Sequence, residues 1–455
     1  MLKWLEEVLG GKPSDQRQPG TEPPAAKTKA AEPPLPLPTF DHHTPDDALA
    51  HGIFSRQVIL DRSYHPLAYE FSLRAANAQG STATLKILVG ILARFGNGLH
   101  SARQFWFRLN DTDLEESLTK TVDPARSVLI VTLTATDNAT MNRALELARL
   151  LKAEGLNLAL AGWQDNEYHH AWLPLCHYVE IRNTSHNPAV LGQWPEKLGA
   201  LSPHIRLVAC DMDSWEELEF CHRQNFQLFR GQLLTHRENW PRQPKLSPER
   251  GQLIDLLNRL HLGADLSEIT EPLKRSPELS YRLLRYINSA GVGTQARIGS
   301  IQQGLMVLGR DKIYRWLTIL LFNSGNAKSL DRALLEQALV RARLMELAAA
   351  DKLAPVQIDE LFVVGIFSLL DMLLQLPMSV ALEPLKLPPA VESTLLNNHT
   401  LESDYAPYLN LAIACEDTDR ERLKALAATL AIPLSRINAL HLDALIWTQQ
   451  TLQES

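Results

Sequence analysis

Arg56-Gln-Val-Ile-Leu-Asp-Arg-Ser-Tyr-His-Pro-Leu-Ala-Tyr-Glu-Phe-Ser-Leu-Arg74 is the stretch of sequence that decides how the first half of the chain folds. Two apolar runs, at residues 54–60 and 67–73, flank a polar turn that contains a proline. Apolar runs of this length separated by turn residues are typical of consecutive β-strands. We therefore expect the first half of the chain to open with this pair of strands.

Further strand-like runs follow at residues 105–109, 128–133, 158–163, 178–181, 205–210 and 226–230. Several are continuously apolar, as in strands covered on both faces. Helical stretches lie between them; the clearest spans residues 138–154 and carries one apolar stripe made of Met141, Leu145, Ala148 and Leu151. This alternation predicts a parallel α/β fold, and the number of strands is compatible with a (β/α) barrel, although about 185 residues is short for one.

The second half of the chain loses the strand signal from about residue 246 onward. Ser247-Pro248-Glu249 and Ser276-Pro277-Glu278 each place a serine at the N-cap and a proline at the first helical position, and Ser300 can cap another helix. We expect helices at residues 248–260, 278–288, 301–308, 311–322, 331–352, 359–376 and 417–430. This half is therefore predicted to be all-α.

Three parts follow from this pattern. Residues 1–45 form a proline-rich flexible segment, since residues 10–40 hold eight prolines. Residues 46–240 form the barrel and residues 241–455 the helical domain, with the boundary in the polar stretch 239–245. Residues 1–9 have helical apolar spacing, which fits either a docking peptide or, more simply, a frayed tail.

Composition excludes several classes of protein. The net charge of −7 over 455 residues argues against general nucleic-acid binding, which needs a basic surface. The four cysteines do not make a disulfide scaffold and fit a reducing cytoplasm. No apolar run reaches 18 residues, so no membrane span is expected, and an acidic pair interrupts the first ten residues where a secretory signal would be apolar.

Two motif sets carry a family resemblance. Residues 56–74 resemble the opening of an EAL domain, whose Glu-Ala-Leu-x-Arg signature reads Glu70-Phe-Ser-Leu-Arg74 here. Residues 246–322 resemble an HDOD domain, a helical relative of HD phosphohydrolases, through Ser276-Pro-Glu-Leu-Ser280, Ile287-Asn-Ser-Ala290, Ser300-Ile-Gln-Gln-Gly304 and Leu308-Gly-Arg-Asp311. A degenerate EAL part followed by HDOD is the arrangement of a family of bacterial signalling proteins.

The resemblance also assigns site positions. The kept remnants of the EAL motif are Glu70, Leu73, Arg74 and Asn110. Other positions have lost the family's residues: Val131 and Thr134 stand at a Glu-x-x-Glu pattern, Ala161 and Gly162 at paired aspartates, Glu180 at the general-base lysine, and Arg182 at an aspartate. The closing Gln-Gly reads Arg230-Gly231.

An active EAL domain resembles a phosphodiesterase that linearises cyclic di-GMP with two divalent metals held by carboxylates and an amide. Valine and alanine cannot ligate magnesium. The resemblance therefore implies an inactive barrel with no catalytic residues, no metal and no cofactor. We expect Glu70 to pair with Arg74 or Arg182 instead, and Arg74, Arg182 and Arg230 are candidate anion-binding residues.

The helical half can also be examined for the metal ligands that its relatives use. HD enzymes place His-Asp on a helix as metal ligands, and Ser368 and Leu369 stand at those positions here. A single E-x-x-H, Glu167 to His170, lacks the second element of a di-iron site and is expected to be a surface loop. A basic run is expected to be a solvated helix face, with phosphate or an acidic partner as the alternative; it comprises Lys274, Arg275, Arg282, Arg285, Arg297 and Arg310.

These observations predict a non-enzymatic signalling protein that acts through protein partners in a bacterial pathway. By family resemblance that pathway concerns motility or surface behaviour, and self-association is possible. The alternative is a metal-independent nucleotide sensor that binds cyclic di-GMP in the barrel mouth. An active hydrolase is the third and least favoured hypothesis.

Overall fold

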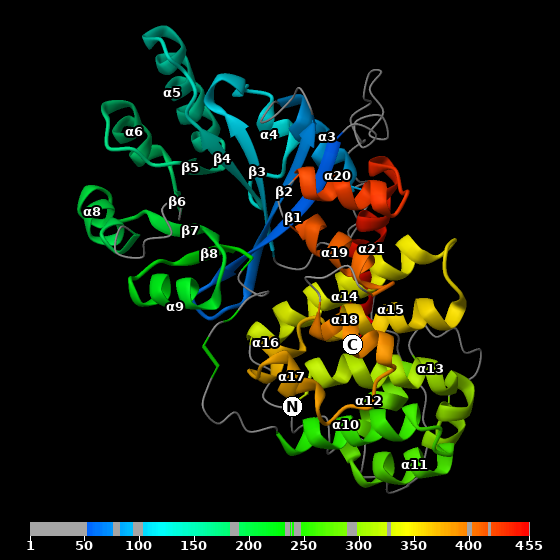
Figure 1. Cartoon of the computed structure of the whole chain (residues 1–455). Coiled ribbons are helices and arrows are strands. Elements are labelled where there is room, and N and C mark those ends of the chain that lie inside the picture. Colours follow the sequence, from blue (N-terminus) through cyan, green and yellow to red (C-terminus); the bar gives the residue numbers. More distant parts are fainter. Residues whose placement is uncertain are drawn as a thin grey trace, which may run out of the picture. The chain divides into compact units, whose positions relative to one another are not determined.

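The computed structural model describes residues 52–75, 82–93, 103–182, 191–232, 237, 239–240, 247–288, 298–324, 329–397, 403–416 and 420–454. The N-terminal segment, Arg297 and most of the boundary at residues 239–245 lie outside them, so the expectations for those residues remain predictions. Residues from His43 to Ser455 belong to one compact unit, which includes both the strands and the helical half (Figure 1).

Eight strands close into a barrel in the order β1 to β8. They are β1 Gly52–Asp61, β2 Pro66–Ala75, β3 Gln104–Asn110, β4 Ser127–Thr132, β5 Asn157–Ala161, β6 Tyr178–Arg182, β7 Arg206–Met212 and β8 Leu228–Gly231. Each coincides with one of the predicted strand-like runs to within a few residues. The α/β barrel and the all-α second half are therefore confirmed.

The barrel is not wholly parallel, which corrects the sequence-based expectation. Strand β1 runs antiparallel to both β2 and β8. The other six pairs, from β2–β3 through β7–β8, are parallel. The reason is local. Only a short turn separates β1 from β2, and the side chain of Asp61 braces it by accepting bonds from the backbone N–H groups of Ser63 and His65. A turn this short joins antiparallel strands, because a parallel connection needs a crossover.

Short helices connect the other strands, which explains how a barrel fits in fewer than 200 residues. They are α3 Thr82–Ala93, α4 Leu118–Thr121, α5 Asn138–Ala153, α6 Glu167–Trp172, α8 Trp194–Leu201 and α9 Trp215–Arg223. Helix α5 buries Leu145, Ala148 and Leu151 of its predicted stripe, while Met141 is half-buried.

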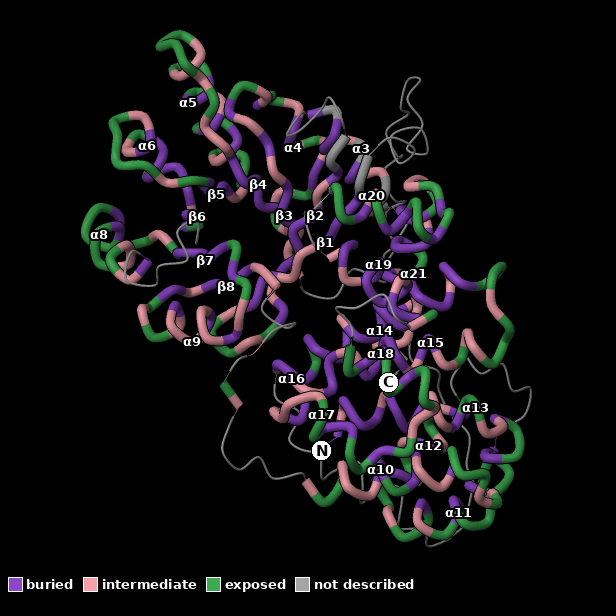
Figure 2. The backbone as a smooth tube through the Cα atoms, viewed as in Figure 1, coloured by how far each residue is buried: buried purple, intermediate pink, exposed green. Residues whose placement is uncertain are grey.

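Side chains alternate between the lumen of the barrel and its outer layer. In β4, Val128 and Ile130 belong to a lumen cluster, whereas Leu129 and Val131 pack in the larger outer cluster. The lumen cluster also contains residues of other strands, among them Ala68, Trp106, Ala159, Ala161, Tyr178, Cys210 and Leu228. Both faces of the central strands are thus buried (Figure 2), as continuous apolar runs require.

The second half is helical throughout its described residues. Its helices are α10 Pro248–His261, α11 Leu266–Arg275, α12 Pro277–Ile287, α13 Ile301–Phe322, α14 Ser329–Ala349, α15 Pro355–Phe367, α16 Leu370–Leu374, α17 Met378–Leu382, α18 Pro389–Leu396, α19 Ala406–Glu416, α20 Arg420–Thr429 and α21 Leu434–Glu454. The predicted caps are confirmed, since the side chains of Ser247, Ser276 and Ser300 each accept a bond from the first helical turn. The sequence analysis missed α11, α17, α18, α19 and α21.

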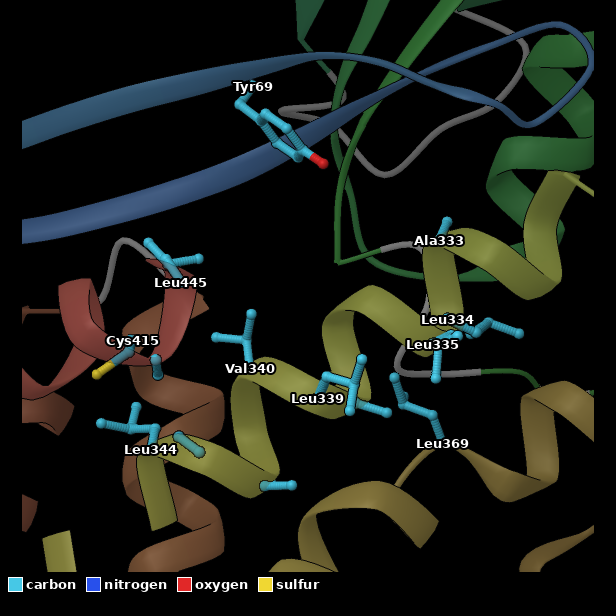
Figure 3. Close-up of a cluster of buried hydrophobic side chains, with 14 of the residues drawn as sticks. Tyr69, Ala333, Leu334, Leu335, Leu339, Val340, Leu344, Leu369, Cys415 and Leu445 are labelled. Carbon is cyan, nitrogen blue, oxygen red and sulfur yellow. The ribbon is translucent and has the colours of Figure 1, made fainter. Parts of the chain in front are cut away.

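Two predicted helices differ in detail. Residues 301–322 form one element kinked at Gly309, whose φ of 75° only glycine adopts readily. The helix expected at 359–376 begins earlier and is broken between α15 and α16 at Ser368 and Leu369. Helix α14 lies in the core of this half, where Val340 and Leu344 share a cluster with Cys415 and Leu445 (Figure 3).

The barrel and the helices share a buried ionic contact centred on Glu336 of α14. Its carboxylate accepts bonds from Arg56 Nη1 (2.6 Å), Arg103 Nη1 (2.7 Å) and the hydroxyl of Tyr69. Gln449 of α21 adds a fourth donor at 3.1 Å. One side chain therefore connects β1, β2 and the N-terminal end of β3 to two helices.

Among the described helices, none alone has the length and apolar character needed to cross a membrane. One bent pair, residues 421–429 with 434–452, meets that criterion jointly, with a 98° bend.

Candidate functional site

Four charged side chains meet in the lumen of the barrel. Glu70 of β2, Arg108 of β3, Glu180 of β6 and Arg230 of β8 are called the lumen quartet below. Each lies two residues after an apolar member of the lumen cluster, namely Ala68, Trp106, Tyr178 and Leu228. Because strand side chains alternate with a period of two, the quartet occupies the next layer of the same inward-facing rows.

The lumen quartet alternates carboxylate and guanidinium. Arg108 bonds Glu70 through Nε (3.2 Å) and Glu180 through Nη2 (2.9 Å). Arg230 Nη1 donates to Glu180 Oε1 (2.5 Å) and to Glu70 Oε2. Two positive and two negative charges cancel, so the cluster is neutral as a whole.

Burial makes this pairing strong. Glu180 is fully buried and Arg230 is 2% exposed. Burial by itself would raise the pKa of Glu180, but the guanidiniums of Arg108 and Arg230 outweigh it and lower that pKa to about 2. The pKa of Arg108 is raised: burial opposes its charge, and Glu180 and Glu70 more than offset this. Glu180, Arg108 and Arg230 are therefore ionised at neutral pH.

The donor set does not fit two divalent metals. Both lumen carboxylates already accept bonds from two guanidiniums, which carry the positive charge that metals would bring. Ala161 lines the lumen without a donor atom. Over the described part of the chain, no cluster of three or more His, Cys, Asp or Glu side chains could hold a metal ion. Carboxylate oxygens are what magnesium prefers, and here none is unshared within the quartet.

The structure corrects two expectations about this site. Glu70 pairs with Arg108 and Arg230; Arg182 pairs with Asp211 at 3.6 Å, and the side chain of Arg74 lies outside the described residues. Arg230 is paired with the carboxylates of Glu70 and Glu180 and therefore does not serve as an anion-binding group. Both errors arise because closure of the barrel lets side chains of β2, β3, β6 and β8 meet inside the lumen, and motif spacing does not reveal this.

A third correction concerns β4. Val131 points into the outer layer, so a carboxylate there would not have faced the lumen; the inward-facing position at this end of β4 is Thr132. Thr134 donates its hydroxyl to Asp111 Oδ1 (2.8 Å) and takes no part in the quartet. The register of the carried-over motif therefore shifts by one residue, and no carboxylate is recovered by the shift.

The other remnants of the motif also lie apart from the quartet. Leu73 is buried in the outer cluster. Asn110 ends β3, and its amide donates to Asp113 Oδ2 (3.1 Å). Among the kept residues whose side chains the structure describes, Glu70 is the one that belongs to the lumen quartet. Arg108 was missed; its signal was a charged side chain inside an apolar strand run.

A cavity of about 850 Å³ opens where β4, β5 and β6 end. Thr132, Ala161, Gly162 and Arg182 line it together with side chains from α5 and α6. The carboxyl ends of barrel strands are where such folds place their sites. We call this cavity the barrel mouth. Among the described residues that line it, Arg182 is the one arginine or lysine, and it is half-exposed.

Asp111 braces the edge of the barrel mouth. It is 1% exposed and accepts bonds from the backbone N–H groups of Thr134 (2.7 Å) and Ala135 (3.2 Å) and from the hydroxyl of Tyr168 (2.8 Å). Burial, together with this bond to Asp111, raises the pKa of Tyr168. Sequence reasoning did not single out Asp111, because its partners come from three separate segments.

The E-x-x-H segment is helical, so the expected surface loop is wrong. Asn166 caps α6 by accepting a bond from the N–H of His169, and His169 is buried. Burial lowers the pKa of His169, which bonds Asn166 Oδ1 through its ring Nδ1 (2.8 Å).

In the helical half, Ser368 and Leu369 lie at the break between α15 and α16. Ser368 accepts a bond from Arg341 Nη1 (3.0 Å) and donates to the carbonyl of Gly365 (2.7 Å), while Leu369 is buried in the core. Arg341 itself makes two bonds of 2.7 Å to Glu416. A serine, a leucine and an internally paired arginine supply no metal ligands.

Comparison with known families identifies the helical half. A model of the HDOD domain matches residues 252–377. The helical half therefore contains an HDOD domain. Ser368 and Leu369 lie within the matched HDOD segment, whereas α18 to α21 lie beyond it.

Two curated proteins are similar to this HDOD protein. The cyclic di-GMP phosphodiesterase CdgJ of Vibrio cholerae serotype O1 is 24% identical over 416 residues, which cover 89% of this chain and 94% of CdgJ. The uncharacterized protein YuxH of Bacillus subtilis is 29% identical over 242 residues, 52% of this chain and 57% of YuxH. The match to CdgJ extends over both halves, and with the HDOD match it confirms the predicted resemblance to EAL-HDOD signalling proteins.

Among solved structures, the PaMucR phosphodiesterase in its c-di-GMP complex matches with a TM-score of 0.34 and 16% identity, over 41% of this chain and 91% of that one. A similarity at this level does not bear on what the barrel of the HDOD protein does.

Proposed function

We propose that this HDOD protein is a non-catalytic signalling protein, related to cyclic di-GMP phosphodiesterases, that acts by binding other proteins. The lumen quartet carries the proposal. A phosphodiesterase of this class needs divalent metals to generate a hydroxide and to clamp the phosphodiester. Two arginines take the place of that positive charge, and they cannot supply a metal-bound water.

The second observation is at the HD position of the helical half. Leu369 is a core residue and Ser368 bonds to Arg341, so this half has no metal ligands there either. Both folds keep their packed cores but lack metal ligands at these positions. This combination suits a protein that functions through binding surfaces on its exterior. The buried, unbridged cysteines fit a cytoplasmic location, which is part of the proposal.

Turnover by the purified full chain tests this proposal. Cyclic di-GMP is incubated with the protein and either Mg²⁺ or Mn²⁺, and the linear product is measured by chromatography. We expect no product above a protein-free control. Metal-dependent product that disappears in Glu70→Gln would overturn the proposal, because it would assign Glu70 a catalytic contact.

A second candidate function is nucleotide sensing by the barrel mouth, which its volume of about 850 Å³ favours. Calorimetric titration with cyclic di-GMP in the absence of metal separates the two. Binding that is weakened tenfold or more in Arg182→Ala supports the sensor, and absence of heat at high protein concentration supports the partner-binding role.

A further inference from the structure

A groove of about 400 Å³ lies on the helical half, formed by α12, α13, α15 and α21. We call it the helical groove. It is separate from the barrel mouth, and its lining residues belong to different elements. Its volume is within the range of about 300–1,000 Å³ typical of small-molecule sites. It also includes α21, which lies outside the segment matched to the HDOD domain.

The lining of the helical groove is cationic. Arg282, Arg285, Lys312 and Arg315 line it, and none of the described lining residues carries a carboxylate. Arg282 is neutralised by Glu278 (2.6 Å) and Arg315 by Glu346. Within the part of the chain that the structure describes, neither Arg285 nor Lys312 has a carboxylate partner. Two positive charges at the groove are therefore uncompensated.

Arg315 has a further unused donor. Its Nε is buried and finds no hydrogen-bond partner among the described residues. A buried N–H without a partner is costly, so a site of this kind calls for an acceptor. A cation–π contact also positions the guanidinium of Arg315, whose central carbon lies 3.9 Å from the centre of the Phe362 ring.

Aromatic rings form the rest of the wall. Tyr286 and Trp316 stack with their centres 6.3 Å apart and an interplanar angle of 23°. Trp447 of α21 meets Phe362 edge to face, also at 6.3 Å. Tyr286 and Trp447 are half-buried, and the guanidinium carbon of Arg343 lies 5.5 Å from the centre of the Trp447 ring. Planar aromatic ligands stack on such rings, which is how proteins hold nucleobases.

Cations beside partly exposed aromatic rings select a ligand that is both anionic and planar. We propose that the helical groove binds a nucleoside monophosphate, with its phosphate at Arg285, Lys312 and Arg315 and its base against Tyr286 and Trp447. Arginine and lysine are the usual phosphate donors in proteins. The basic run that the sequence analysis assigned to a solvated face thus contributes Arg282 and Arg285 to a built cavity.

The test is a calorimetric titration of the full chain with AMP and GMP, each beside two partial ligands, the free nucleoside and inorganic phosphate. Quenching of tryptophan fluorescence provides a second readout, because Trp316 and Trp447 line the groove. We expect at least one nucleotide to bind in the micromolar range and to quench. Both partial ligands are expected to bind at least tenfold more weakly.

Two matched double variants locate the site. Arg285→Ala with Lys312→Ala removes the uncompensated charges of the helical groove and is expected to weaken binding at least tenfold. Arg275→Ala with Arg436→Ala removes two exposed arginines that do not line the groove. Arg182→Ala, in the barrel mouth, serves as a second control. The two control variants are expected to bind as the unchanged protein does.

Several outcomes would overturn the proposal. No heat with either nucleotide at millimolar concentration excludes the site. Equal losses in the two double variants mean a general charge effect. Phosphate binding as tightly as a nucleotide means an anion site without base recognition, and loss of binding in Arg182→Ala moves the site to the barrel mouth. None of these results depends on whether the protein hydrolyses cyclic di-GMP.

Discussion

Arg230 Nη1 donates a hydrogen bond to Glu70 Oε2 inside the closed barrel, although 160 residues separate them in the chain. Strand β8 pairs with β1, and β1 pairs with β2, so closure of the barrel brings the last strand within reach of the second. The same nitrogen also bonds Glu180. The lumen of this barrel therefore holds an internal salt-bridge network.

Removing Arg230 should destabilise the barrel strongly. In Arg230→Met, Arg108 alone would face two buried carboxylates, and breaking a buried ion pair from one side costs about 3–5 kcal/mol. Urea unfolding measures the loss of unfolding free energy. Arg182→Met is the matched control, because its half-exposed pair with Asp211 contributes at most about 1 kcal/mol. Similar losses of unfolding free energy in both variants would show that the lumen quartet stabilises the fold no more than an exposed ion pair does.

Acid should weaken the fold through Glu180. Its pKa falls from 4.5 to about 2 on folding. A carboxyl with a depressed folded pKa contributes stability that is complete above pH 4.5 and is lost as the pH falls toward 2. At about 1.36 kcal/mol per pKa unit, the full contribution is roughly 3 kcal/mol. The free energy of unfolding, measured between pH 6 and pH 3, should fall less steeply with decreasing pH in Glu180→Gln than in the unchanged protein. An equal fall in the two proteins would contradict the prediction.

Glu336 should matter to both halves of the unit. In Glu336→Gln, Arg56 and Arg103 lose the carboxylate that neutralises them among the described residues. Because these ion pairs are buried, we expect the loss to cost about 3–5 kcal/mol. The matched control is Glu383→Gln, an exposed carboxylate outside any ion pair of the described residues. Chemical unfolding followed by tryptophan fluorescence gives both values. A loss below about 1 kcal/mol in Glu336→Gln would rule out a structural role for this contact.

Gly365 should resist any side chain. A Cβ at this position would overlap the backbone of Ala342, because α14 and α15 approach closely there. Gly365→Ala is expected to cost about 1–3 kcal/mol, as overpacking does. Gly199→Ala in α8 is the control, since nothing lies near its Cβ position and alanine favours a helix by about 0.5–1 kcal/mol. Thermal unfolding should therefore shift in opposite directions for the two variants.

Local signals account for the successes of the sequence analysis. The eight strand runs and the serine caps at Ser247, Ser276 and Ser300 depend on neighbouring residues, and all are found where predicted. The break at Ser368 was missed because it arises from contacts with Arg341, which lies on another helix. The mostly apolar composition of residues 359–376 predicted one continuous helix across this break.

The sequence by itself determined the type and order of the eight strands and the starts of the serine-capped helices, because side-chain identity and periodicity are local properties. Only the tertiary structure decided which charges meet. Glu70 and Glu180 both bond Arg108 and Arg230, because strand order and the two-residue alternation set which side chains share the lumen. The helical groove likewise exists only because packing places α21 beside α12 and α13.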